Sequence, residues 1–468
     1  MRQPLLRFLR PPSIYWRSRL NKSKPPSRQH DLPQHSSPFI TFRSMSVSKD
    51  PINHVAYGYI EDVERLSNYR PGGFHPITIG TELHKRYRVV HKLGYGTYST
   101  VWLARDKESQ EFVAVKVGVA DSNLPEVDVL SALGSDHHSI SGSSGRDLIP
   151  PVLDRFEIHG PNGVHPCYVT VPARGCVAGA KDGSYSRLFQ LDVVRALAAQ
   201  LILAVAFLHS HGYIHGDLHL GNVLLRLPFN FSQLSDEQLY EKNGAPELEP
   251  VIRLDHKDLL SGVPSHAIPP AWFGEPSERV SFPESNILLS DFGESFSPSQ
   301  ELRYESHTPI SIRPPETRFE PDTPLSFSSD IWTLACTIWS VSGQRPLFDG
   351  TIATEDDITC EQVDAFGLLP PEWWRKWDAG RHWYTEAGNP TNGRTVRSWE
   401  DRFEDSIQKP RRDERLAAFD LEESTAILAM MWPMLSFKPE DRPTIGQVLE
   451  SDWMLRWGLP TYERLRTW

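Results

Sequence analysis

Apolar and polar residues alternate between residues 87 and 106, and Gly94 and Gly96 interrupt the alternation. A period of two that is broken by glycines predicts a β-hairpin with its turn at the glycines. A second apolar strand follows at 112–117 and carries Lys116 in its interior. A lysine that points inward from an apolar strand is costly to bury unless it is paired. The pattern therefore predicts a charged partner for Lys116.

The next segment, 124–130, supplies two acids for that role. Val127 and Leu130 are spaced as the apolar stripe of a helix. Glu126 and Asp128 lie on the same helix, and we favour Glu126 as the partner of the strand lysine. The alternative is that both acids are solvated.

The clearest helical period runs over 191–211 and stops at Gly212. Over 213–225 the residues are first apolar, then polar and then apolar again. This pattern predicts a strand, a loop and a second strand. Asp217 and Asn222 lie five residues apart in that loop. Phosphoryl transfer to a hydroxyl needs such a pair, an aspartate to accept the proton and an asparagine to hold magnesium. Taken alone, the segment could also be a plain polar loop between core strands.

An irregular stretch, about 227–286, separates this loop from the next apolar strand. A connection between two strands needs only a few residues, so we interpret the stretch as an insertion. The strand at 287–290 ends in Asp291-Phe292-Gly293, which predicts Asp291 as a second magnesium ligand. Farther on, Ser328-Ser329-Asp330 begins an apolar helix with capping residues.

Composition limits the class of protein. The 468 residues suffice for two or three domains, and 39% hydrophobic with 23% charged residues is typical of a globular chain. The longest apolar runs, 196–208 and 331–341, are shorter than the roughly 20 residues of a membrane span. The four cysteines form no C-x-x-C pair, which favours reduced thiols in an intracellular protein.

The first 46 residues differ from the rest, with nine Lys/Arg and one acid. Since the whole chain carries −11 and this arm +8, residues 47–468 carry −19. The arm is rich in Pro, Ser and Arg, which predicts disorder. It resembles a mitochondrial transit peptide, although prolines interrupt its amphipathic helix. The alternatives are an unprocessed basic tail and an upstream extension before a start at Met45.

In their order along the chain, these motifs resemble a eukaryotic protein kinase from about residue 87 to residue 457. The matching residues are Gly94, Gly96, Lys116, Asp217, Asn222, Asp291, Glu316, Asp330 and Arg442. More narrowly, Gly-Gly-Phe-His-Pro at 72–76, Tyr-Ser-Thr-Val-Trp-Leu at 98–103 and the insertion resemble the SR-protein kinases, which phosphorylate serine/arginine-rich splicing factors. The segment 357–370 also resembles an extra segment of the wider kinase group.

The resemblance implies an α+β, two-lobed kinase fold. Its parts would be a basic arm (1–50), an N-terminal extension (51–86), a small β-rich N-lobe (87–173) and a larger, mainly helical C-lobe (174–468). ATP would lie between the lobes, where Thr170 gates the adenine pocket and the backbone of Val171 and Ala173 binds adenine. Arg442 would be a buried partner of Glu316.

The site residues follow from the same resemblance. Asp217, Lys116, Glu126 and His219 would be catalytic, and Asn222 and Asp291 would hold Mg²⁺. The nucleotide-binding residues would be Leu93, Gly94, Tyr95, Gly96, Thr97, Tyr98, Ser99, Thr100, Val101, Ala114, Lys116, Thr170, Val171 and Ala173.

Two positions depart from the family pattern. His219 stands where a serine/threonine kinase usually has a lysine, and Gly216 stands where many kinases have an arginine that binds a phosphorylated activation segment. Small-molecule phosphotransferases share the His-Gly-Asp pattern but lack the later motifs, and a scaffold without catalysis is a second alternative. We expect an Arg/Ser-rich protein substrate, docked by acidic clusters at 355–357, 400–405 and 422–423. We expect a monomer that binds neither nucleic acid nor membrane directly and is found in cytoplasm and nucleus, with mitochondria as the alternative.

Overall fold

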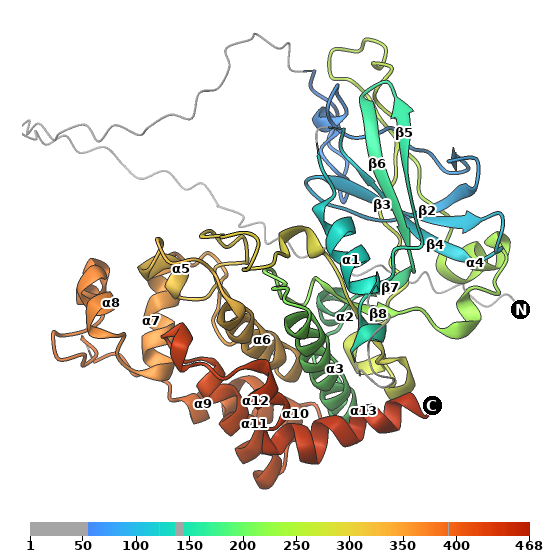
Figure 1. Cartoon of the computed structure of the whole chain (residues 1–468). Coiled ribbons are helices and arrows are strands. Elements are labelled where there is room, and N and C mark those ends of the chain that lie inside the picture. The colour runs from blue at the N-terminus through green and yellow to red at the C-terminus, as the bar shows by residue number, and fades with distance from the viewer. Residues whose placement is uncertain (1–54, 121, 136–144, 392) are drawn as a thin grey trace, which may run out of the picture. The chain divides into compact units, whose positions relative to one another are not determined.

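The computed structural model describes residues 55–120, 122–135, 145–391 and 393–468 (Figure 1). The predicted basic arm lies outside these residues, as does most of the Gly/Ser/His-rich loop that the sequence predicts at 134–148. The contacts group residues 56–468 into one unit.

A six-stranded antiparallel sheet forms the first half of this unit, with strand order β1-β2-β3-β4-β6-β5. Its strands are β1 (Glu82–Leu83), β2 (Tyr87–Tyr95), β3 (Ser99–Asp106), β4 (Phe112–Gly118), β5 (Asp154–Gly160) and β6 (Gly163–Thr170). The predicted hairpin and the lysine-bearing strand are confirmed as β2, β3 and β4. The predicted helix over 124–130 is α1 (Pro125–Ser135), which packs against the turn at 292–294.

The register of the sheet shows which side chains lie on each of its two faces. Lys116 lies opposite Val101, whereas Trp102 lies opposite both Lys92 and Val115. Since successive side chains of a strand point to opposite faces, Lys116 and Lys92 occupy different faces of one sheet. The face with Lys92 and Trp102 packs under the N-terminal extension and the insertion.

The second half of the unit is mainly helical and is built around α3 (Leu191–Ser210), which confirms the helix predicted over 191–211. This helix packs against α6 (Phe327–Ser342), α12 (Ile445–Leu449) and α13 (Leu459–Arg466). Among the described residues it is also the one helix long and apolar enough to cross a membrane, but 83% of its most apolar window is buried. We therefore assign it to the core.

Outside the insertion, the other α-helices of the described residues have between 4 and 14 residues. They are α2 (Val177–Asp182), α5 (Glu316–Phe319), α7 (Glu355–Phe366), α8 (Pro371–Lys376), α9 (Trp399–Phe403), α10 (Lys409–Asp413) and α11 (Leu421–Met434).

A small sheet of β7 (Ala173–Cys176), β8 (Val223–Arg226) and β11 (Ile287–Leu289) lies between the two halves of the chain, in the order β11-β8-β7. The apolar residues of 166–173 predict a strand over that range, and the prediction is wrong at its end, because β6 stops at Thr170. Pro172 has no N–H to donate to a ladder. The strand predicted at 213–214 is reduced to a single bridge between Ile214 and Phe296.

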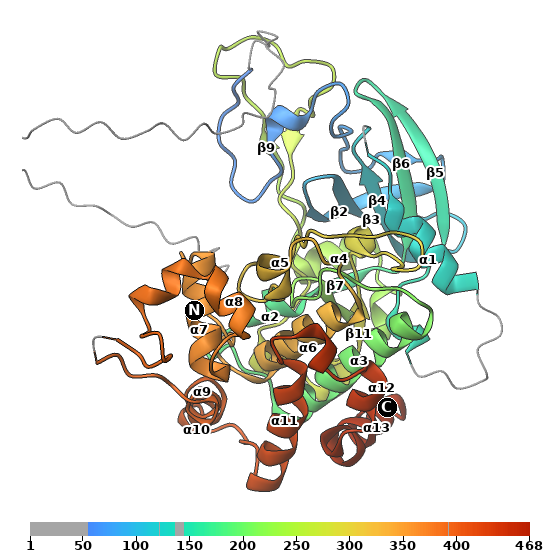
Figure 2. The ribbon, with the colours of Figure 1, turned by 60° about the vertical axis from the view of Figure 1, so that its left-hand side comes forward.

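Most of the insertion is irregular, as the sequence predicts, but part of it forms regular structure. It contains α4 (Asp236–Asn243) and a two-stranded ribbon of β9 (Glu249–Pro250) and β10 (His266–Ala267). Figure 2 shows β9 beside the N-terminal extension, and Tyr57 pairs with Arg253 there. These elements are short and are held by residues far away in the chain, so local periodicity gives no sign of them.

Candidate active site

The loop from residue 215 to 222 is fixed by a buried carboxylate. Asp330 on α6 accepts hydrogen bonds from the backbone N–H groups of His215 (2.8 Å) and Gly216 (3.0 Å). Its Oδ2 also lies 3.0 Å from the Nε2 of His209. Burial alone would raise the pKa of Asp330, but the neighbouring histidines lower it, so the group stays charged.

The prediction that Ser328 to Asp330 cap α6 is confirmed only for Ser329. Ser326 is the N-cap and forms a capping box with Ser329, whereas Asp330 binds the loop. The aspartate points inward because the loop offers two N–H groups, which satisfy a buried charge better than one helix end does.

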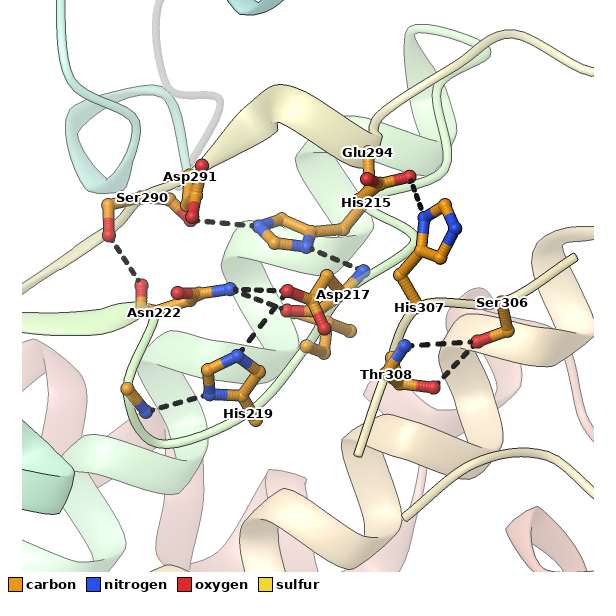
Figure 3. Close-up of polar contacts among 12 residues, drawn as sticks. His215, Asp217, His219, Asn222, Ser290, Asp291, Glu294, Ser306, His307 and Thr308 are labelled. Carbon is orange, nitrogen blue, oxygen red and sulfur yellow. Dashed lines mark hydrogen bonds and ion pairs between the residues drawn. The ribbon is translucent and has the colours of Figure 1, made fainter. Parts of the chain in front are cut away.

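Asp217 is held from two sides (Figure 3). The amide nitrogen of Asn222 donates to its backbone oxygen (2.9 Å) and to its Oδ2 (3.1 Å). The Nε2 of His219 lies 3.4 Å from the same Oδ2. The other carboxylate oxygen, Oδ1, is buried and has no hydrogen-bond partner among the described residues. One oxygen of Asp217 is thus bound within the protein, and the other is left for a ligand.

The environment keeps Asp217 ionised. Burial would raise the pKa of its carboxyl, but the hydrogen bonds from His219 and Asn222 and the charge interactions with the histidines lower it overall. An ionised carboxylate with a vacant acceptor can take a hydroxyl proton.

His219 is oriented by the backbone. The N–H of Gly221 donates to its Nδ1 at 3.0 Å, so this nitrogen carries no hydrogen in the observed geometry. The hydrogen of the neutral ring is then on Nε2, which faces Asp217. The sequence placed a histidine here but could not give its tautomer.

Lys116 and Glu126 form a close pair. The lysine Nζ lies 2.7 Å from Oε1 and 2.8 Å from Oε2 of the glutamate, and 3.6 Å from Oδ1 of Asp291. Asp128, the rival partner, is exposed. Burial alone would lower the pKa of Lys116, but Glu126 and Asp291 raise it. The lysine therefore remains charged and reaches acids from two different elements.

Asp291 has a strained backbone. Its φ of 61° and ψ of 71° lie in the left-handed region, which residues other than glycine seldom adopt. The backbone N–H and the hydroxyl of the preceding Ser290 both donate to the carbonyl of Asn222, at 2.8 and 2.9 Å. These bonds bring the two predicted magnesium ligands to adjacent positions, and the Asp291 side chain is 55% exposed.

The glycine turn has room above it. A Cβ added to Gly94 or Gly96 would meet no protein atom within 4 Å, and neither residue has a positive φ. Nothing inside the protein requires glycine at these two positions. Glycines would be required by a ligand that approaches the backbone closely, as nucleotide phosphates do.

The other predicted nucleotide contacts divide by face. The side chains of Val101, Ala114 and Thr170 share the face of Lys116, since Ala114 lies opposite Thr170 in the ladder. The Thr100 side chain points to the opposite face, where its hydroxyl accepts the Trp102 indole N–H at 2.9 Å. A nucleotide contact from that residue would therefore come from its backbone.

The rest of the predicted set surrounds this face. Thr97 and Tyr98 form the turn, with Tyr98 69% exposed, while Ser99 is buried. Leu93 packs against a cluster that includes residues of the insertion. Val171 lies in the link to β7, where Ala173 begins the strand. The Thr170 hydroxyl donates to the carbonyl of Pro151 at 2.7 Å, so it is already engaged.

The later motifs also meet as the sequence predicts. Arg442 forms a bidentate pair with Glu316, at 2.8 and 2.6 Å. Both side chains are buried. This pair fixes the end of the segment that begins at Asp291.

The predicted acidic docking clusters are largely engaged within the protein. Internal ion pairs are Glu355–Arg313, Asp356–Arg318, Glu404–Arg412, Glu422–Arg456 and Glu423–Arg195. Asp357 and Asp401 complete capping boxes. A surplus of charge in the sequence therefore overstates the number of acids that can bind a substrate.

The chain was compared with known proteins, and no family model matches it. It is 26% identical over 405 residues to a serine/threonine protein kinase of Aspergillus fumigatus, which covers 84% of this chain and 90% of that protein. It is 25% identical over 413 residues to the serine/threonine-protein kinase SRPK of Physarum polycephalum, with 84% and 91% covered. A stretch of 169 residues is 34% identical to SRSF protein kinase 3 of Homo sapiens, with 35% and 30% covered.

Proposed function

We propose that this chain, a homologue of serine/threonine protein kinases that include SRPK and SRSF protein kinase 3, transfers phosphate from MgATP to serine in Arg/Ser-rich proteins. Its enzyme class, a serine/threonine protein kinase, is that of these relatives, and ATP with Mg²⁺ is what such enzymes use. The substrate, its connection with splicing and the assignment of each residue are our proposal. The single observation that carries it is the vacant, buried Oδ1 of Asp217 beside Asn222 and Asp291.

The proposed fold has two lobes, the sheet of 87–173 and the helical part of 174–468, with the nucleotide between them. Lys116 and the glycine turn would bind the phosphates. Asn222 donates its amide nitrogen to Asp217, which leaves its amide oxygen for a cation. Together with the Asp291 carboxylate this oxygen is the hard-ligand set that Mg²⁺ prefers. The bound ion would neutralise charge that develops on the phosphates.

In the proposed mechanism Asp217 orients a substrate hydroxyl and accepts its proton on Oδ1. The amide of Asn222 and the ring of His219 hold the other oxygen, so the carboxylate cannot rotate away from the substrate. The one N–H of the neutral His219 ring is already directed at Asp217, so this side chain would stabilise developing negative charge less than the fixed charge of a lysine.

We also propose that the activation segment needs no phosphate. Gly216 has a φ of 79°, and a Cβ there would lie 2.5 Å from the carbonyl oxygen of Glu294. An arginine therefore does not fit at this position without movement of the segment. Glu294 contacts His307 at 3.0 Å (Figure 3) and Arg303 at 3.6 Å, and so supplies an anion to basic groups of the segment. Treatment of bacterially made protein with phosphatase should change turnover by less than about tenfold.

A docking surface for an Arg-rich segment is proposed beside the activation segment. A cavity of about 510 Å³ lies between that segment and α7, and its lining is mixed: Glu305 and Glu355 lie there with Arg313 and Arg318, which are ion-paired with acids of α7. Glu305 is exposed and has no ion pair among the described residues, unlike most of the acids in the clusters named above. Charge attraction of this kind raises encounter rates and weakens with salt.

The test is a phosphorylation assay with MgATP on an Arg-Ser repeat peptide, a neutral serine peptide and an aminoglycoside. We expect the repeat peptide to exceed the neutral peptide by at least about tenfold in kcat/KM at low salt, with the advantage shrinking as salt rises. Asp217→Asn should abolish transfer while ATP still binds. Transfer to the aminoglycoside alone would favour a small-molecule phosphotransferase, and ATP binding without any transfer would favour a scaffold.

The compartment is proposed to be cytoplasm and nucleus. Residues 1–45 lie outside the described part of the chain, so their role rests on composition. Fluorescently tagged forms with and without residues 1–45 separate the two proposals, because a mitochondrial signal that disappears on deletion would establish a transit peptide.

A further inference from the structure

A buried ion pair connects the N-terminal extension to the strand that carries the glycine turn. Lys92 lies on β2 two residues before Gly94 and is 1% exposed. Its ammonium group contacts the carboxylate of Glu64, which is 5% exposed. The same carboxylate accepts the hydroxyl of buried Tyr69. A buried charge pair of this kind persists only with such complete partners.

The lysine also reaches the turn itself. Its Nζ lies 5.2 Å from the centroid of the Tyr95 ring and 5.5 Å from that of Trp102, within the range of cation–π attraction. Tyr95 stands between the two glycines of the turn. A continuous set of contacts therefore runs from Glu64 in the extension, through Lys92, to a residue of the predicted phosphate-binding turn.

The extension is firmly anchored behind Glu64. A Cβ on Gly73 would lie 1.9 Å from the carbonyl oxygen of Asn68, so no other residue fits there without movement. The buried side chain of Asn162, at the turn between β5 and β6, donates to the carbonyls of Phe74 and Gly262, both at 2.7 Å. Extension, sheet and insertion thus share one hydrogen-bonded joint.

The insertion holds the same strand from its edge. The N–H of Ala271 donates to the carbonyl of Lys92 at 2.8 Å. The hydroxyl of Tyr240 donates to the carbonyl of Val90 at 2.9 Å. Two carbonyls of β2 that would otherwise form an open sheet edge are therefore satisfied by residues more than a hundred positions later in the chain.

We propose that Glu64 is a positioning residue for ATP binding, which acts through Lys92 on Tyr95 and so fixes the backbone of the glycine turn. The inference rests on the proposed function, since it assumes that the turn binds the phosphates of ATP. Without the carboxylate, the lysine is left charged in an apolar site, and it either draws in water or moves out. Each change removes the cation–π contact between Lys92 and Tyr95 and lowers the order of the turn before the nucleotide binds, which costs affinity.

The first experiment measures the equilibrium Kd of MgATP, the KM for ATP and kcat for Glu64→Gln. We expect Kd and KM to rise at least about fivefold while kcat changes less than about twofold, because the group acts on nucleotide binding and not on the hydroxyl. The matched control is Glu82→Gln, which removes an exposed ion pair to Lys107 on the same sheet (2.6 Å). The control should leave all three quantities unchanged.

The second experiment separates positioning from folding. The double variant Glu64→Gln/Lys92→Met removes both charges but keeps the volume, so it should melt at a higher temperature than either single variant. Its KM for ATP should nevertheless stay raised at least about threefold, and no higher than in the single variants, because no cation holds Tyr95. If both the melting temperature and the KM for ATP of the double variant return to the wild-type values, Glu64 has only a structural role and the proposal is overturned.

The two proposals fail in different ways. A wild-type protein that binds no MgATP would overturn the proposed function and this inference with it. A wild-type protein that binds MgATP while Glu64→Gln binds it equally well would overturn only the inference.

Discussion

Two buried lysine–glutamate pairs lie on opposite faces of the same sheet, and they differ in what else surrounds each lysine. Lys116 is 15% exposed and faces two acids, Glu126 at 2.7 Å and the partly exposed Asp291 at 3.6 Å. Lys92 is 1% exposed and is enclosed by Glu64 and two aromatic rings. Under the proposed function the first lysine would exchange one of its acid partners for an incoming phosphate, whereas the second is enclosed and has no such freedom.

This difference in surroundings shows that a lysine–glutamate pair can either present a charge for binding or hold two segments together. The lysine of the Lys116–Glu126 pair is partly exposed and also faces Asp291, so its charge is available for binding. A sealed pair contributes no free charge, but breaking it leaves an uncompensated ion in the core. We therefore expect changes to the first pair to appear in catalysis, and changes to the second to appear in stability and in the order of the glycine turn.

The largest expected effect is on turnover when the cleft pair is broken. Lys116→Met should lower kcat/KM by at least about a hundredfold. The reason is that the transition state loses the positive charge that would contact the phosphates. Steady-state kinetics on the Arg-Ser peptide measures the loss, and Lys92→Met, which should lose less than about tenfold, is the comparison. Equal losses would show that the two lysines do not differ in role.

The next effect is on the stability of the extension. Glu64→Gln leaves the lysine on β2 unpaired and should destabilise the local structure by about 3–5 kcal/mol. Hydrogen exchange of the amides at 64–74 should accelerate accordingly, since these amides open with the extension. Glu126→Gln, which breaks the cleft pair, is the control and should leave exchange there unchanged. Unchanged exchange in Glu64→Gln would contradict the sealed character of the outer pair.

A smaller effect separates the pairs by pH. Burial lowers the pKa of Lys92 from 10.5, against the opposing effect of Glu64. The unfolded chain therefore binds this proton more tightly than the folded protein, and the stability that this position contributes rises as pH rises toward 10.5. For Lys116, burial is outweighed by Glu126 and Asp291, which raise the pKa, so its contribution is full below 10.5 and is lost only as the pH rises above that value.

The measurement is the melting temperature of wild type, Lys92→Met and Lys116→Met between neutral pH and about pH 10. The difference between wild type and Lys92→Met should move in favour of wild type as pH rises. The difference for Lys116→Met should stay constant over the same range. A constant difference in both cases would show that Lys92 titrates as an ordinary lysine.

The smallest effect belongs to an exposed pair on the same sheet. Glu82→Gln removes the contact with Lys107, in which both side chains are more than 40% exposed. Surface ion pairs contribute about 0–1 kcal/mol, so the free energy of unfolding should change by less than that. Chemical denaturation measures it, and a larger change would mean that exposure is a poor guide to the two buried pairs.

The sequence by itself determined the parts whose geometry is local. The spacing of residues was enough to predict two motifs. One is a glycine turn followed by an apolar strand with one lysine, and the other is a loop with Asp217 and Asn222 five residues apart. The helix at 191–211 and the hairpin at 87–106 follow from periods of 3.6 and 2, which depend only on near neighbours. The pairing of Lys116 with Glu126 was also within reach, because ten residues separate them.

Only the tertiary structure decided the rest. Asp330 anchors a loop 115 residues earlier in the chain, and Glu64 meets Lys92 across 28 residues, although little regular structure lies between Glu64 and the start of β2. The insertion contains a helix and a ribbon whose buried positions are covered by the sheet and the extension. The Nδ1 of His219 accepts a hydrogen bond from the backbone N–H of Gly221, and this bond could not be predicted from the residue types. In each case packing between distant segments determines which residues become partners. The periodicity of a sequence reflects only contacts within one helix or strand, so it cannot predict these partners.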